Sequence, residues 1–349
     1  MSRALTAGIV VVVIIIGVAL AYRTGFSSPS TLSSTVTVTD YVGGITSSAP
    51  QDFAGDAEGI FARHNLKVNF VTLEGTSQAV QAVAADRRGF AFTQGDLLDE
   101  MLLADKNPSA PALIGVAATE PRNPVALIFL VSSGIKRPAD LAGKTIGVPT
   151  GSLSEQYLDI FLQKQGIAKD KVTVQNIGFA ALHPALLQKR VDAICEFARG
   201  LASLNIVAQQ QGQRVGSFLF GDYQMPSPLG AVVVPKSLVD KDPAVAGAVA
   251  TALTEALYFC ATKPEQCTKD FVAKNPGRDY DQTLAEWKIA LKAQYGLDTA
   301  KIQKVRPLQL GWFDPNLVAT TLPELQTLFK INRTFDPITL YTNQFVERP

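Results

Sequence analysis

Hydrophobic positions along the chain follow two spacings in alternation. Residues 35–39 alternate polar and apolar with a period of two, which is typical of a half-buried strand. Residues 51–64 and 77–87 instead repeat apolar positions at helical spacing, and residues 68–71 between them predict a strand. Further strands are expected at residues 90–92, 112–116 and 125–131, with a helix at residues 96–104. This order predicts a mostly parallel sheet flanked by helices.

The alternation restarts in the middle of the chain. A strand at residues 145–148 precedes a helix at residues 152–165, which Gly166 ends as a C-cap residue. Strands are then expected at residues 172–175, 191–195 and 231–234, and helices at residues 180–189, 243–260, 281–295 and 323–329. Roughly 315 residues follow the N-terminal leader described next, which suits two domains better than one. We therefore predict an α/β protein with two lobes.

The first 34 residues predict an export segment. Residues 9–21 are apolar after a start that carries Arg3, and Ala19-Leu20-Ala21 offers the small residues of a leader-peptidase site. The alternative is an uncleaved anchor, although the apolar run is shorter than the ~20 residues of a normal membrane span. Residues 26–34 are rich in Ser and read as a flexible leader. Residues 1–34 are thus a signal peptide or membrane anchor plus leader, and either reading places the body outside the cytoplasmic membrane.

Charge and cysteine content narrow the class of protein. The net charge is +1 over 349 residues with no basic stripe, so nucleic acid is not an expected partner. Cys260 and Cys267 flank Pro264, which we expect to separate two helices, and in an oxidising compartment the pair can form a small-loop disulfide. Two free thiols are the alternative. A zinc site would need further ligands nearby, and the two histidines, His64 and His183, are far away in sequence, so no metal is expected. No cofactor is expected either.

Five segments resemble type 2 periplasmic binding proteins of ABC transporters. Residues 143–152, Gly-Lys-Thr-Ile-Gly-Val-Pro-Thr-Gly-Ser, resemble the start of the second lobe in that family. The branch they resemble binds thiamine-pyrimidine precursors, sulfonates and related solutes. The other segments fall in the family's order, at residues 59–66, 75–83, 133–141 and 188–193. The resemblance covers about residues 35–276, and the C-terminal tail matches less clearly.

The resemblance implies a two-lobed fold, each lobe a mostly parallel sheet flanked by helices. Lobe one would hold residues 35–127 and 230–349, including a helical C-terminal tail, and lobe two residues 128–229. It also implies a small-molecule ligand, an ABC permease as partner, and a monomer. The ligand would lie between the lobes at the carboxyl ends of the strands, where open α/β sheets generally bind ligands.

The turn at Thr150, Gly151 and Ser152 has the strongest physical case for ligand contact. Ser152 and Glu155 form an S-x-x-E capping box at the start of a helix. Free backbone N–H groups and the helix dipole there can hold an electronegative ligand atom. A helix cap that serves stability alone is the alternative, and the resemblance favours contact.

Polar residues follow the expected strands of lobe one as well. Gln94 can both donate and accept hydrogen bonds, while Asp96 suits an N-cap. Thr76 lies in a similar turn, where capping is an equally good reading. Asp40 and Tyr41 end the first strand, and Tyr41 can either stack on a flat ligand or lie on the lobe surface.

In lobe two, Glu196 follows an apolar strand. A carboxylate in that position is costly unless it is paired or hydrogen-bonded, so it suits a ligand that brings donors and repels a sulfonate or nitrate. Pyrimidine binders of the branch that the chain resembles often carry a Glu near this point. A salt bridge with Arg199 is the alternative. Phe179, Tyr223 and Met225 can supply apolar walls or belong to the core or rim.

Several enzyme classes are excluded. A P-loop fails because Pro138 stands where its first Gly is required, and no G-x-S-x-G motif is present. A Cys–His pair could use only Cys195 with His64 or His183, and Cys195 reads as inert strand core. The yeast-type pyrimidine synthase shares the resemblance but carries a cysteine-rich, iron-linked motif that this sequence lacks.

We therefore predict an exported solute-binding protein that is not an enzyme. Its lobes would close on a ligand held by both, and the closed form would dock on an ABC permease. A heteroaromatic or amine-bearing vitamin precursor, such as a thiamine precursor, is the expected ligand because of Glu196 and Tyr41. The alternatives are a sulfonate or nitrate binder and a membrane-anchored sensor or adaptor with the same fold.

Overall fold

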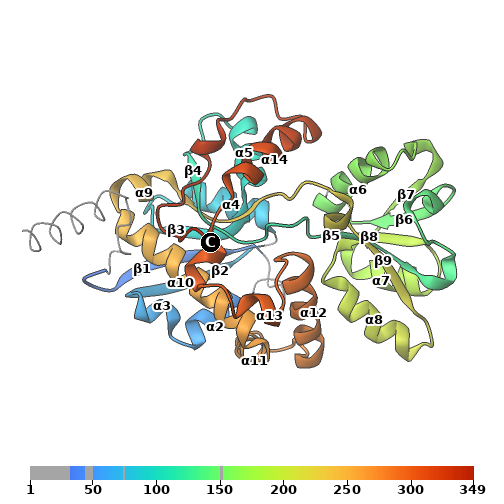
Figure 1. The fold of residues 1–349 in the computed structure, drawn as a ribbon, viewed down its shortest axis with the longest axis horizontal. Helices are drawn as coiled ribbons and strands as arrows, with labels where there is room; N and C mark the ends of the chain where they lie inside the picture. The colour runs from blue at the N-terminus through green and yellow to red at the C-terminus, as the bar shows by residue number, and fades with distance from the viewer. Residues whose placement is uncertain (1–31, 44–49, 74, 150–151) are drawn as a thin grey trace, which may run out of the picture.

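The chain forms two sheets, each covered by helices on both faces (Figure 1). The computed structural model describes residues 32–43, 50–73, 75–149 and 152–349. The expected signal segment, apart from its last three residues, and the candidates Thr150 and Gly151 lie outside the described residues. Below, lobe one is the first sheet with the helices that pack on it, and lobe two is the second sheet with its helices.

The first sheet has the strand order β2-β1-β3-β10-β4. β1 pairs in parallel with β2 and β3, whereas β10 runs antiparallel to both β3 and β4. Its strands are β1 (Val36–Val42), β2 (Leu66–Thr72), β3 (Ala91–Asp96), β4 (Leu113–Ala118) and β10 (Gly230–Pro235). The helices of this part of the chain are α2 (Gln51–Ala57), α3 (Ile60–Arg63), α4 (Thr76–Ala85), α5 (Leu97–Lys106), α9 (Lys236–Lys241) and α10 (Pro243–Thr262).

The second sheet has the order β7-β6-β8-β5-β9, with β5 antiparallel to β8 and β9. Its strands are β5 (Val125–Leu130), β6 (Thr145–Val148), β7 (Thr173–Asn176), β8 (Ala193–Phe197) and β9 (Val215–Leu219), and its helices are α6 (Leu153–Lys164), α7 (Phe179–Leu187) and α8 (Gly200–Gln210). Short 3-10 turns are η1 (Val131–Ser133), η2 (Pro138–Leu141), η3 (Lys169–Lys171) and η4 (Phe220–Tyr223).

Each sheet thus contains one antiparallel strand, and in both cases it is the strand with which the chain arrives from the other lobe. β5 follows β4 of the first sheet, and β10 follows β9 of the second. The other strands of each sheet end at the edge that faces the neighbouring lobe. A strand that enters the sheet through that edge is therefore antiparallel to them. This confirms the predicted two-lobed, mostly parallel α/β fold. All of β5 pairs within the second sheet, so the crossing lies before Val125 rather than after residue 127.

Three local differences from the sequence expectation have simple causes. The expected helix at residues 51–64 is split into α2 and α3 at Gly59, whose left-handed φ of 67° ends a helix. β3 extends to Asp96, so Gln94 lies in the strand and not in the turn after it. The last helix, α14, begins at Pro315, a favoured first helical residue, and not near Pro323, which it accommodates in its interior.

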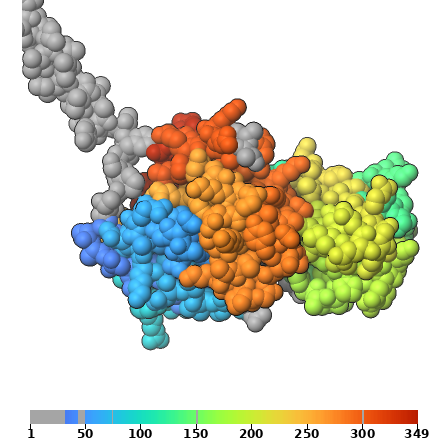
Figure 2. Space-filling model, turned by 90° about the horizontal axis from the view of Figure 1, so that it is seen from below, coloured from blue at the N-terminus to red at the C-terminus, as the bar shows by residue number. Residues whose placement is uncertain are grey.

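The C-terminal tail contacts both lobes. α12 packs against α8 of lobe two, and Figure 2 shows the orange part of the chain lying against the yellow-green second lobe. At the end of α14, the ring of Phe329 lies 5.4 Å from that of Tyr157 on α6. The tail holds α11 (Pro264–Lys274), α12 (Tyr280–Ala293), α13 (Thr299–Ile302), η5 (Pro307–Gly311), α14 (Pro315–Leu328) and η6 (Pro337–Thr339).

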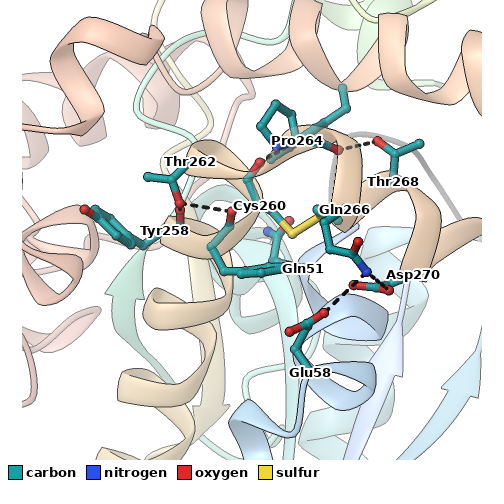
Figure 3. The surroundings of a disulfide bond; sticks show 12 residues. Gln51, Glu58, Tyr258, Cys260, Thr262, Pro264, Gln266, Thr268 and Asp270 are labelled. Carbon is teal, nitrogen blue, oxygen red and sulfur yellow. Dashed lines mark hydrogen bonds between the residues drawn. A yellow bond between two sulfur atoms is a disulfide. The ribbon is translucent and has the colours of Figure 1, made fainter.

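The predicted disulfide between Cys260 and Cys267 is present and joins α10 to α11, with Pro264 as the first residue of α11 (Figure 3). Both cysteines are buried in one core cluster with Ala54 of α2 and with Trp287 and Tyr295 of the tail. The bond therefore stabilises the packing around α2. Among the described residues, α10 is the one helix long and apolar enough to cross a membrane, and 78% of that stretch is buried inside the protein.

Candidate ligand-binding site

Side chains from β3 and α2 form a hydrogen-bonded group at the edge of lobe one. Gln94 donates from Nε2 to Oδ1 of Asp52 at 2.6 Å, and Gln51 donates from Nε2 to Oε1 of Gln94 at the same distance. Gln51 also donates to the Tyr295 hydroxyl at 3.3 Å. Because Gln51 and Asp52 are the first two residues of α2, the helix start delivers both side chains to the carboxyl end of β3. Gln94, which the sequence predicts as a ligand contact, thus lies in a polar group at the end of β3.

Asp40, near the end of β1, lies beside this group. Its side chain is fully buried, and neither carboxylate oxygen has a hydrogen-bond partner among the described residues. Burial, and then the charge of Asp52, raises the pKa of Asp40 well above its usual range. Burial also raises the pKa of Asp52 to about 7, although the hydrogen bond from Gln94 works against this shift. Both carboxyls therefore hold protons more tightly than exposed ones do.

A third acidic group connects the two lobes. Burial raises the pKa of Glu120 to about 7, against the attraction of Arg199 and a hydrogen bond with Tyr295. Arg199 precedes α8 in lobe two, and burial lowers its pKa despite the opposing charges of Glu120, Glu196 and Glu286. The polar network that begins at Gln94 thus continues through Tyr295 and Glu120 to lobe two.

Glu196 is the matching carboxylate of lobe two. Its side chain is buried, and Oε1 lies 2.6 Å from Nε2 of His183 on α7. Burial alone would lower the pKa of His183, but the hydrogen bond and charge of Glu196, with a smaller effect of Glu286, raise it above its usual value. A Cβ on Gly200 would lie 2.5 Å from the same carboxylate oxygen, so the close approach of α8 requires glycine there.

A cavity of about 460 Å³ opens beside Glu196. Phe179 is 59% exposed at its wall, and the Arg199 guanidinium stacks 4.5 Å above the Phe197 ring. The volume suits a small organic molecule, since ligand pockets usually measure about 300–1,000 Å³. The lining combines α7, the end of β8, α8 and the tail: Phe179, Ala180, His183, Glu196, Phe197, Arg199, Gly200, Ser203, Val207, Arg278, Gln282 and Glu286. Two of the expected site residues, Phe179 and Glu196, meet here.

The structure places other candidates away from this cavity. The Tyr41 hydroxyl donates to Oδ2 of Asp86 at 3.0 Å, so the residue anchors the end of α4 and does not reach toward lobe two. Tyr223 is partly buried and packs its ring edgewise on Phe161 and Phe218, against the core on the α6 side of the second sheet. Tyr41 was expected near the ligand because it ends the first strand, and position at a strand end does not fix the direction of a side chain. Tyr223 was expected either as an apolar wall or as part of the core or rim.

The helix-start candidates have mixed placements. Ser152 is the N-cap of α6 and accepts from the Glu155 N–H at 3.2 Å, as the capping box predicts. Asp96 caps α5 in the same way, accepting from Asp99 N–H at 2.7 Å. Thr76 is the first residue of α4, whose N-cap Gly75 makes no side-chain cap. Cys195 was interpreted as strand core, and core was one of the interpretations of Met225. Both residues are buried in the core of the second sheet.

Four residues of the site were not predicted from the sequence: two at the start of α2, one inside α7 and one in the tail. Gln51 and Asp52 sit at a helix start that directly follows Pro50, and this polar pair at N1 and N2 was a readable signal. His183 lies inside a strongly apolar helix segment, where a single His signals a buried partner. Tyr295 had no local signal, because its role depends on how the tail packs across α2.

Comparisons with known proteins agree with this architecture. The NMT1/THI5-like family matches residues 50–267, more than half of the chain. A Haemophilus influenzae protein provisionally named a thiamine biosynthesis protein is 26% identical over 221 residues, covering 63% of this chain and 67% of that protein. A Brucella abortus protein provisionally named a binding protein is 25% identical over 227 residues, covering 62% of this chain and 64% of its own length.

The chain thus spans about two thirds of the length of these relatives. Among solved structures, the periplasmic aliphatic sulphonate-binding protein SsuA of Escherichia coli superposes with a TM-score of 0.63 at 14% identity, covering 89% of this chain and 99% of that one. At this identity the likeness concerns the fold alone. The chain belongs to the NMT1/THI5-like family and has the two-lobed fold of periplasmic solute-binding proteins.

Proposed function

We propose that this protein is exported and binds a small solute between its two lobes, for delivery to an ABC permease. The observation that carries the proposal is the polar network that crosses from lobe one to lobe two. Gln51 contacts Tyr295, and Glu120 attracts Arg199, beside the cavity at Glu196. A ligand in this position contacts both lobes and therefore favours the closed arrangement over an open one.

Export is supported by two independent features. The N-terminal sequence has the pattern of a signal peptide. The buried Cys260–Cys267 disulfide is typical of proteins that fold in an oxidising compartment. SsuA, which has the same fold, is periplasmic according to its name.

For the ligand we propose a heteroaromatic compound that carries hydrogen-bond donors, such as a pyrimidine related to thiamine. The carboxylate of Glu196 offers acceptors, Phe179 offers an exposed ring for stacking, and a relative's name points to thiamine biosynthesis. Sulfonate or nitrate is less suited, because Glu196 and Glu286 stand in the same cavity as Arg199 and Arg278. Nothing in this arrangement requires a reaction, so we propose binding and not catalysis.

Thermal unfolding against a solute panel tests this proposal. The panel holds aminopyrimidines, thiamine, riboflavin, sulfonates, nitrate and amino acids, since a ligand at one hundred times its Kd adds roughly 2.7 kcal/mol of stability. We expect a clear rise in Tm with a pyrimidine that is lost in Glu196→Gln. The matched control is Glu265→Gln, whose side chain is 60% exposed and pairs with Lys288 on the surface.

A Tm shift with sulfonate or nitrate alone would keep the transport role and contradict the assigned role of Glu196. No shift with any compound of the panel would contradict solute binding and favour a sensor or adaptor role.

A further inference from the structure

The edge of lobe one that faces lobe two carries six acidic side chains. They come from five different segments, so the concentration is a property of the fold and not of a local acidic run. The group comprises Asp40 on β1, Asp52 on α2, Asp96 at the end of β3, Asp99 and Glu100 on α5, and Glu120 after β4. Asp40, Asp52, Asp96 and Glu100 are each less than 10% exposed. We call this set the acidic edge.

The members of the acidic edge repel one another. The charge of Asp52 acts on Asp40, and the charges of Asp99 and Glu120 act on Asp96. The charges of Asp96 and Asp99 act in turn on Glu100. Two cations oppose them: Arg199 attracts Glu120 and Lys106 attracts Asp99. Burial and this mutual repulsion together raise the pKa values of Asp40, Asp96 and Glu100 well above their usual range.

Buried polar atoms without partners point to what the acidic edge can bind. Both carboxylate oxygens of Asp40, both of Glu100, and the buried hydroxyl of Tyr157 from lobe two have no hydrogen-bond partner within the described part of the chain. Tyr157 also lies within the field of Asp96. A buried carboxyl without donors is stable only when it holds a proton or faces a cation.

We propose that the solute is an organic cation whose positive group binds at Asp40, Asp52 and Glu120, while the rest of the molecule extends toward Glu196. This inference rests on the proposed function, because it names the charge class of the same solute. Asp96 is less suited to direct contact, since it already caps α5. A metal ion is disfavoured because no group of three His, Cys, Asp or Glu side chains in the described ranges is arranged to hold one.

The proposal has a pH consequence. A cation stabilises the ionised carboxylates, so its binding expels the protons that Asp52 and Glu120 hold below about pH 7. Affinity should therefore rise as the pH approaches 7 and level off above it. Four groups face these two carboxyls: Asp40, Asp96, Tyr295 and Arg199. Among these four, Arg199 is the one that carries a positive charge.

Two probes that differ by one charge test the inference. Aminomethylpyrimidine is a cation when its amine is protonated, and hydroxymethylpyrimidine is its neutral counterpart. Calorimetric titration of the full chain should give a Kd at least about tenfold lower for the cation at about pH 7, a difference of about 1.4 kcal/mol. The difference should shrink at about pH 5.5, where binding of the cation should release protons to the buffer.

Asp52→Asn should abolish the preference for the cation, because Asn keeps an acceptor for Gln94 but removes the charge. Glu120→Gln is a second variant with the same expected result. Asp170→Asn, with a side chain 74% exposed, should behave as the wild type. Equal, pH-independent binding of both probes would overturn the inference while leaving solute binding intact, and so would stabilisation by zinc in place of the cation. Binding of neither probe would contradict the proposed pyrimidine-type solute itself, and the inference with it.

Discussion

The two sides of the inter-lobe site handle buried carboxylates in opposite ways. On lobe two, Glu196 is held by His183 at 2.6 Å and lies within the field of Arg199, so its charge is compensated within the lobe. On lobe one, Asp40 is as deeply buried but has no hydrogen-bond partner among the described residues. The wall at Glu196 is therefore already formed in the free protein, whereas the wall at Asp40 gains most from a proton or a ligand.

The largest loss of stability is expected when Glu196 of lobe two loses its partner His183. His183→Ala leaves Glu196 buried without its partner and should lower the free energy of unfolding by roughly 3 kcal/mol, measured by urea denaturation at neutral pH. The control is His64→Ala: His64 lies 3.0 Å from Glu255, whose side chain is 34% exposed, and its loss should cost less than about 1 kcal/mol.

The same pair has a defined pH dependence. The folded-state pKa of His183 is raised, so the stabilisation is complete below its unfolded pKa and is lost as the pH rises through the folded value. Equal effects of the His183 and His64 variants at all pH values would contradict the special status of the buried pair.

The disulfide joins α10 to α11 and lies in a core cluster of lobe one and the tail. Replacing Cys260 and Cys267 by Ser should lower the free energy of unfolding by roughly 2.5 kcal/mol, the value expected for a short closed loop. Because the bond shares a core cluster with Tyr295 and Ala54 of α2, solute affinity should fall as well. Reducing agent should reproduce both effects in the wild type and leave the double variant unchanged. An unaltered affinity would show that the support of α2 does not depend on the bond.

Removing the charge of Asp52 from lobe one should raise the free energy of unfolding, which is opposite to the effect of His183→Ala. The pKa of Asp52 is about 7 in the folded protein and 3.8 as a reference, so the folded state loses stability as the pH rises between these values. Asp52→Asn removes this loss and should raise the free energy of unfolding at about pH 7 by on the order of 2 kcal/mol. Stability curves at several pH values measure it, and a destabilised variant would contradict the account of lobe one.

The smallest effect concerns Tyr41. Tyr41→Phe removes one hydrogen bond to Asp86 and should cost about 1 kcal/mol of stability while leaving solute affinity unchanged. The control Tyr280→Phe removes only a long contact of 3.4 Å to the Glu265 carbonyl and should be near neutral. Loss of solute binding in Tyr41→Phe would contradict this placement by giving the Tyr41 hydroxyl a role in ligand binding, since phenylalanine keeps a ring that can stack.

The fold could be predicted because its signals are local. Period-two and helical spacings gave the order of strands and helices, and the capping box placed the start of α6 at Ser152. The short spacing of Cys260 and Cys267 around Pro264, together with the export segment, favoured the disulfide over two free thiols. Each of these features depends on residues that are close in sequence.

The site was only partly predictable because it depends on distant contacts. Glu196 and Gln94 follow from strand position, whereas Tyr295 meets Gln51 across 244 positions of the chain. Which face of the sheet a side chain occupies could not be predicted from the sequence either. Asp40 and Tyr41 are adjacent, and alternation along β1 places them on opposite faces of the sheet. The direction decides that Asp40 lies beside Asp52 while Tyr41 bonds to Asp86.

The most direct test of the account is whether the solute depends on both lobes at once. Aminomethylpyrimidine would be titrated into the wild type, Asp52→Asn of lobe one, Glu196→Gln of lobe two and the control Asp170→Asn. The account predicts that each of the first two variants weakens binding by at least about tenfold and that the control does not. Wild-type affinity in both site variants would contradict binding between the lobes.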